Sequence, residues 1–187
     1  MTLRRIAALA GLLLLAGCAR RVAPTDAGPS PAHFYPLAVG HRWTYAVEFL
    51  GETREQQVEI LKQQDGFFHD NQGGALSVDA FGVRDQKRYL LRAPVVAGRT
   101  WENVISSSVT EHYRVLEVGV ACETRAGRFP DCVRVEARNR MNLDTTLVNV
   151  LTFAAGVGLV RVQVVAEAKG KKIPQTQLEL TAYRLAR

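Results

Sequence analysis

Hydrophobic and polar side chains alternate along several segments of this chain. The alternation is clearest in residues 43–50, 57–60, 133–138, 160–165 and 178–183. A period of two is typical of β-strands with one buried face, because successive side chains of a strand point to opposite sides. Turn-forming pairs such as Gly51-Glu52 and Asp65-Gly66 separate some of these segments. The pattern therefore predicts a series of strands joined by tight turns.

The predicted strands are antiparallel. Parallel strands need crossover helices, and no segment of a dozen residues after residue 17 has a convincing helical face. We expect an all-β fold, an antiparallel meander of about nine to eleven strands. So many short strands favour a sheet that curls into a barrel, a half-barrel or a sandwich.

The N-terminal residues follow a different pattern. Arg4 and Arg5 precede an uninterrupted apolar run over residues 6–16. This run is too short to span a bilayer as a helix, which takes ~20 residues, but it fits the ~7–15-residue core of a secretory signal. Residues 1–17 are therefore predicted to be a cleaved signal peptide.

The sequence Leu15-Ala16-Gly17-Cys18 resembles the lipobox of bacterial lipoprotein precursors. The resemblance implies cleavage before Cys18, a diacylglyceryl group on its sulfur and an acyl chain such as palmitate on its new amino group. Ala19 stands where an Asp commonly retains such proteins at the inner membrane, so the resemblance implies an outer-membrane protein facing the periplasm in a two-membrane cell. The alternative is a secreted protein with a chance cysteine near its cleavage site.

Residues 18–32 are small, polar and proline-containing, with Pro24, Pro29 and Pro31. Such a composition is typical of an extended tether. The predicted organisation is therefore a signal peptide over residues 1–17, a lipidated tether over 18–32 and one β domain over 33–187.

Short motifs in the β domain also carry a resemblance. They are Tyr35-Pro36-Leu37 with Gly40, Trp43 and Tyr45; Pro94, Gly98 and Trp101; Ala126-Gly127-Arg128-Phe129 with Cys132; and Gly156-Val157-Gly158-Leu159-Val160. Together they are similar to a group of largely uncharacterised envelope lipoproteins. The domain is also loosely similar to periplasmic lipoprotein carriers, in which a curled sheet surrounds a helical lid, although no lid helix is evident here. The aromatic residues among the motifs, Trp43, Trp101 and Phe129, are expected to pack in the core rather than to form a ligand platform.

Cys122 and Cys132 remain once Cys18 is assigned to lipid. Disulfides persist outside the cytoplasm, and the turn at Ala126-Gly127 lies midway between the two cysteines, so a disulfide across a hairpin is expected. Direct opposition of the cysteines would put two preceding valines on the same face as two following charged residues. The hairpin therefore needs a bulge or register offset near Arg128-Phe129. Two buried free thiols are the alternative.

Charge and candidate chemistry add little. Removal of residues 1–17, with Arg4 and Arg5, lowers the formal net charge from +6 to +4, which indicates mild attraction to anionic headgroups or polyanions. Export to the envelope argues against nucleic acid as a partner. The histidines lack metal-ligand spacing; they are His33, His41, His69 and His112. The serines at 106–108 lack the elbow motif of hydrolases. We predict no enzyme activity, no catalytic residues, no metal site and no cofactor.

Three functions remain open. The first is a non-enzymatic structural or protein-interaction lipoprotein at the outer membrane, held there by its acyl chains. The second is a domain that binds or carries a lipid or another apolar ligand, which predicts a cavity lined by Val, Leu and Phe. The third is an enzyme with an unfamiliar site, which requires titratable residues to converge in a cleft.

The lipid anchor yields a direct prediction. A single acyl chain gives only marginal membrane affinity, whereas two or three give stable anchoring. Cys18→Ser should therefore move the protein from the membrane fraction to the soluble fraction, as measured by fractionation after an alkaline or high-salt wash. A variant that stays in the washed membranes would contradict the lipoprotein assignment.

Overall fold

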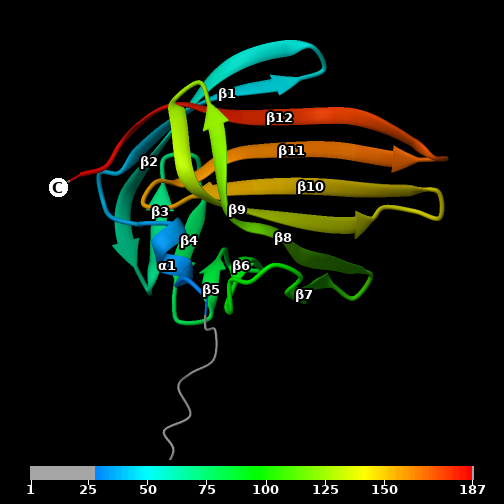
Figure 1. Ribbon diagram of the computed structural model, residues 1–187, viewed down its shortest axis with the longest axis horizontal. Coiled ribbons are helices and arrows are strands. Elements are labelled where there is room, and N and C mark those ends of the chain that lie inside the picture. Colours follow the sequence, from blue (N-terminus) through cyan, green and yellow to red (C-terminus); the bar gives the residue numbers. More distant parts are fainter. Residues whose placement is uncertain (1–27, 187) are drawn as a thin grey trace, which may run out of the picture.

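Twelve antiparallel strands form a single sheet in the computed structural model, which describes residues 28–186 (Figure 1). The elements are α1 (Pro31–Phe34), β1 (Arg42–Phe49), β2 (Glu52–Gln64), β3 (Phe67–Asp70), β4 (Ala75–Val78), β5 (Gly82–Arg84), β6 (Tyr89–Arg92), β7 (Thr100–Ser106), β8 (Val109–Thr124), β9 (Gly127–Arg140), β10 (Thr145–Ala154), β11 (Gly158–Ala168) and β12 (Lys171–Arg184). The all-β prediction is confirmed. The strand count is slightly higher than expected, because β3 to β6 are only three or four residues long and show little alternation.

The strand order explains how the sheet closes. It runs β6-β5-β4-β3-β2-β1-β12-β11-β10-β9-β8-β7, so every pair of neighbours is consecutive in sequence except β1 and β12. The pairing of β1 with β12, for example Tyr45 opposite Leu180, joins the two halves of the chain in the middle of the sheet. The edge strands β6 and β7 are consecutive, and the sheet curls until they approach each other, giving a nearly closed barrel.

The inner face of the sheet holds the hydrophobic core. Trp43, Phe34 and Phe153 are fully buried. The indole Nε1 of Trp43 donates a hydrogen bond of 2.8 Å to the carbonyl oxygen of Val157, so burial leaves its polar atom satisfied. The predicted core positions of Trp43, Trp101 and Phe129 are confirmed, since their exposed fractions are 0%, 5% and 7%.

Side chains close the seam between the two edge strands. The side-chain oxygen of Asn103 on β7 accepts from the backbone N–H of Tyr89 on β6 at 3.0 Å, and the Asn103 side-chain nitrogen donates to the Tyr89 carbonyl at 3.1 Å. Trp101 Nε1 donates to the same carbonyl at 2.9 Å. The Asn103 amide thus takes the place of a neighbouring strand, and the edge at Tyr89 keeps its backbone hydrogen bonds.

A buried carboxylate lies beside the seam. Glu111 on β8 is 8% exposed and accepts from Arg88 at 3.0 Å and from the Tyr113 hydroxyl at 2.9 Å. Burial raises the pKa of the Tyr113 phenol above its ordinary value, and the Glu111 carboxylate raises it further, so Tyr113 stays protonated and donates. This cluster neutralises its own charge and adds contacts between the two edges.

The N-terminal part of the chain is described only from residue 28. The predicted signal peptide, Cys18 and residues 19–27 of the predicted tether lie outside the described residues. Two of residues 28–32 pack against the domain: a Cβ atom added to Gly28 would lie 2.5 Å from the Val95 carbonyl oxygen, and Pro31 is buried. Within residues 28–186, no helix combines the length and apolarity needed to cross a membrane.

The seam yields a prediction about stability. Asn103→Ala removes the acceptor of the Tyr89 backbone N–H and one of the two side-chain donors to its carbonyl, while Trp101 still donates to that carbonyl. Leaving a buried backbone N–H unsatisfied costs about 1–3 kcal/mol. We expect that loss in urea unfolding and faster amide hydrogen exchange at Tyr89. Asn149→Ala, in a half-buried strand position outside the seam, is the control. Equal effects of the two substitutions would contradict a sealing role for Asn103.

Candidate functional site

The end of the β8–β9 hairpin folds back over the sheet. In Figure 1 this yellow-green hairpin rises across β10, β11 and β12. Residues 123–128, here called the hairpin tip, reach β12, where the backbone N–H of Ala126 donates to the Leu180 carbonyl at 3.1 Å. The hairpin tip therefore covers part of the face opposite the core.

Irregular pairing allows the hairpin to bend. Val120 lies opposite Cys132, and Cys122 lies opposite Phe129, so β9 has one extra residue in this interval. The predicted register offset is found here, beside Phe129. On β8 a further shift falls at Gly119, whose φ of 72° lies in the left-handed region that favours glycine. Such bulges increase the local bend and twist of a hairpin.

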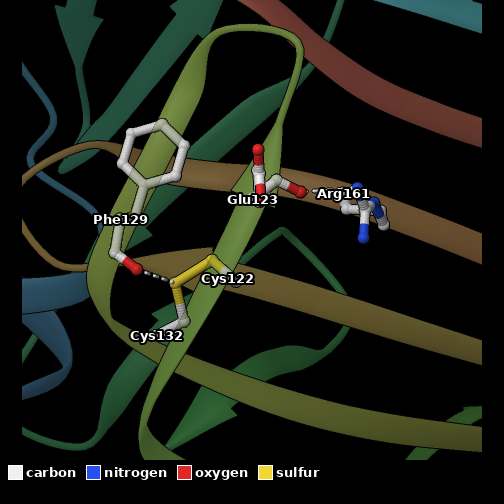
Figure 2. Close-up of a disulfide and its surroundings, with 5 residues drawn as sticks. All are labelled: Cys122, Glu123, Phe129, Cys132 and Arg161. Carbon is white, nitrogen blue, oxygen red and sulfur yellow. Dashed lines mark hydrogen bonds between the residues drawn. A yellow bond between two sulfur atoms is a disulfide. The ribbon is translucent and has the colours of Figure 1, made fainter.

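A disulfide joins Cys122 and Cys132 below the hairpin tip (Figure 2). Their Cα atoms are 6.1 Å apart, and Cys132 is fully buried. The alternative of two free thiols does not hold in this structure. The bond cross-links the two strands at the point where they bend, and it thereby limits movement of the hairpin tip relative to the base of the hairpin.

Cross-strand register places a row of polar residues under the hairpin tip. Arg134 on β9 pairs with Thr152 on β10, which pairs with Arg161 on β11, which in turn pairs with Glu179 on β12. At the start of the row, Arg134 forms an ion pair with Glu117 on β8 at 2.7 Å. Directly opposed residues share a face, so the row crosses five strands on the side of the sheet away from the core.

The hairpin tip is bound to this row by charge-assisted contacts. Arg161 Nη2 donates to the carbonyl oxygen of Glu123 at 2.6 Å, as Figure 2 shows, and to Glu179 at 2.9 Å. Arg125 of the hairpin tip lies 3.4 Å from the same carboxylate, whose side chain is only 14% exposed. Glu179 therefore connects the hairpin tip and the sheet through two arginines.

An open groove of about 790 Å³ lies between the hairpin tip and the sheet. We call it the hairpin groove. Its lining residues are Ala121, Cys122, Glu123, Thr124, Arg125, Arg134, Thr152, Arg161, Gln163 and Glu179. Three arginines and two glutamates among them give it both signs of charge. Such a lining is suited to a polar or charged partner and not to an acyl chain.

The other residues singled out in the sequence do not gather in this groove. His33 lies 3.3 Å from Asp131, and His112 lies 3.0 Å from Glu102, both at the surface. The buried ring of His41 contacts the carbonyl oxygen of Pro36 at 3.1 Å. Among residues 28–186, no group of three or more His, Cys, Asp or Glu side chains could hold a metal ion.

The sequence carries no signal for the charged members of the hairpin groove. Arg134, Arg161 and Glu179 occupy polar positions of alternating strands and are not distinguished there from other charged residues. Their meeting depends on the register of four strands and on the bend of the hairpin. The only sequence signal near the groove was the cysteine pair.

Comparisons with known proteins add no family. No protein-family model matches the sequence, and no curated protein matches it. A solved structure from Bacteroides fragilis, described as a "putative exported protein with YMCC-like fold", is similar with a TM-score of 0.46 and 12% identity, over 82% of this chain and 99% of that one. A "putative lipoprotein" from Parabacteroides distasonis has a TM-score of 0.43 and 10% identity, over 81% and 98% of the two chains. The resemblance of the sequence to envelope lipoproteins stays a prediction.

The disulfide yields a second stability prediction. The cysteines are 10 residues apart, and closing a loop of this size contributes about 2–3 kcal/mol in the chain-entropy model. The double variant Cys122→Ala/Cys132→Ala should lose that amount in urea unfolding. A reducing agent should destabilise the parent protein similarly and leave the variant unchanged. Identical unfolding midpoints for parent and variant would contradict a stabilising bond.

Proposed function

We propose that this protein is a non-enzymatic interaction module, anchored by acyl chains on Cys18 at the outer membrane and facing the periplasm. In this proposal the hairpin groove binds a polar, charged segment of another envelope protein. The observation that carries the proposal is the disulfide-bonded hairpin, whose tip is fixed over a row of arginines and glutamates. The lipobox in the sequence supports the membrane anchor, and the order Leu15-Ala16-Gly17-Cys18 is its basis.

The shape and rigidity of the hairpin groove support a binding role. A partner that enters a preorganised site loses less free energy to ordering than one that must fix a mobile loop. Here the tip is held by the disulfide, by the backbone bond from Ala126 to Leu180 and by the contacts of Arg161. The charged lining would select partners by complementary charge.

The chemistry of the groove favours binding over catalysis. The Glu179 carboxylate accepts from Arg161 at 2.9 Å and lies beside Arg125. Arg134 is likewise engaged with Glu117. In each pair the arginine neutralises the charge of the glutamate. This arrangement is expected of a surface that presents fixed charges and not of a general acid or base.

A photocrosslinking experiment in intact cells tests this proposal. Gln163 is exposed and lines the hairpin groove, so a photoreactive amino acid placed there should form an adduct of defined mass in the envelope. The matched control is Gln63, an exposed glutamine on β2 outside the groove.

A variant that lacks one charge of the hairpin groove tests whether the Gln163 adduct depends on the groove. Arg134→Ala should lower the yield of the Gln163 adduct about five-fold, since one interfacial charge pair contributes on the order of 1 kcal/mol. Folding of this variant is checked by thermal unfolding. Adducts of the same mass and yield from Gln63, or a Gln163 adduct insensitive to Arg134→Ala, would contradict the proposed partner site.

One observation favours the second function, the binding of an apolar ligand. The core-facing positions of β11 stay apolar beyond the packed core, at Val162, Val164 and Ala166, yet these residues are only half-buried. An inner face of this kind would accept an acyl chain along β11. The carrier function predicts that such a chain stays with the purified protein.

A further inference from the structure

The far end of the long strands forms a projecting tip. Residues 141–144 join β9 to β10, and residues 169–170 join β11 to β12. Because Thr145 pairs with Ala168, the two turns lie side by side. They stand at the right-hand end of the sheet in Figure 1, away from α1.

Apolar side chains are exposed at this end. Leu143 is 86% exposed, Met141 59% and Ile173 47%. These three residues together with Arg140, Lys169, Lys171 and Lys172 are here called the strand-end patch. Met141 and Leu143 lie in the β9–β10 turn, and Ile173 is the third residue of β12, opposite Ala166. Single exposed apolar residues are common, but a group of three at one end of a sheet is typical of a contact surface.

The turn that carries Leu143 is well formed. The Arg140 guanidinium donates to the carbonyl oxygens of Asn142 and Leu143 at 3.2 and 3.3 Å. The Asn142 side-chain oxygen accepts from the Asp144 backbone N–H at 2.9 Å. The turn therefore holds Leu143 out into solvent by its own hydrogen bonds.

Positive charge surrounds the apolar residues on both faces of the sheet. Lys171 pairs with Ala168 on the core-facing side, whereas Lys172 pairs with Glu167 on the opposite side. Lys172 is 77% exposed. The four basic residues of the strand-end patch outnumber its acidic neighbours, Asp144 and Glu167. Glu167 is shared between Arg138 and Lys172, whose Nζ lies 3.6 Å from the carboxylate, so two cations face one acidic group there.

We infer that the strand-end patch binds the surface of an anionic phospholipid bilayer. Leu143 and Met141 enter the boundary between headgroups and acyl chains, and the lysines on both sides contact anionic headgroups. The combination of apolar side chains with flanking basic residues is what interfacial membrane binding requires. A convex tip suits a soft headgroup layer better than a rigid protein surface, which needs complementary shape.

This contact is distinct from the proposed function. It involves neither Cys18 nor the hairpin groove, and it would hold the long axis of the sheet toward a membrane. It also predicts vesicle binding by a chain that carries no acyl group. A failure of that chain to bind vesicles would therefore contradict this inference without bearing on the hairpin groove or the lipid anchor.

Vesicle sedimentation with the mature Cys18→Ser chain tests the inference. We expect binding to vesicles of phosphatidylethanolamine containing about 30% phosphatidylglycerol, and at least about ten-fold weaker binding to pure phosphatidylcholine. Leu143→Ser should weaken binding to the anionic vesicles about ten-fold, because it removes a side chain from the apolar boundary. Lys171→Gln and Lys172→Gln should each weaken it about five-fold.

Phe81→Ser is the matched control, because Phe81 is 67% exposed but lies in the β4–β5 turn. It should leave binding unchanged, and thermal unfolding should show every variant to be folded. Three results would overturn the inference: no binding by the parent chain, equal loss in Phe81→Ser and Leu143→Ser, or binding that survives every substitution in the strand-end patch. Strand-end crosslinks to a protein without vesicle binding would assign the patch to a protein partner instead.

Discussion

Closure of one twelve-stranded sheet is the constraint on which the rest of this structure depends. The sheet has an apolar face that must be buried, and curling buries it only if the two edges meet without leaving backbone groups unpaired. At this seam the Asn103 amide binds both backbone groups of Tyr89. One polar side chain thus completes at the seam what hydrogen-bonded strands do elsewhere in the sheet.

The closed sheet leaves two regions that the core does not need. On the outer face, the bent hairpin and its disulfide cover the row from Arg134 to Glu179 and create the hairpin groove. At the end of the long strands, the turns extend past the packed core and expose Leu143. The same strands that build the core therefore carry a charged groove and an apolar, basic tip in separate places, which allows the two proposed contacts to be tested separately.

The sequence predicted those features that depend on neighbouring residues. Alternation over residues such as Trp43 and Tyr45 indicated strands with a buried face, and the structure buries both side chains. The spacing of Cys122 and Cys132 around a turn indicated a hairpin with an offset register, which is also present. Both signals are local, since they need only the period of a strand and the length of a loop.

Features that depend on distant strands could not be predicted in this way. Arg161 meets Glu179 and Glu123 together only because two strands and a bent hairpin come together, and Asn103 meets Tyr89 only because the sheet closes. No periodicity encodes the register between such segments. The lipidation of Cys18 has a local signal but lies outside the described residues, so fractionation and not the fold decides it.

Our proposal makes the domain an interaction module and not a carrier. Native mass spectrometry of the Cys18→Ser chain purified from the periplasm, combined with lipid extraction, distinguishes the two. An apolar ligand enclosed by the sheet would survive purification and add a stoichiometric mass. We expect the mass of the protein alone. A lipid bound at one molecule per chain would contradict the claim and would assign the inner face of β11 to ligand binding.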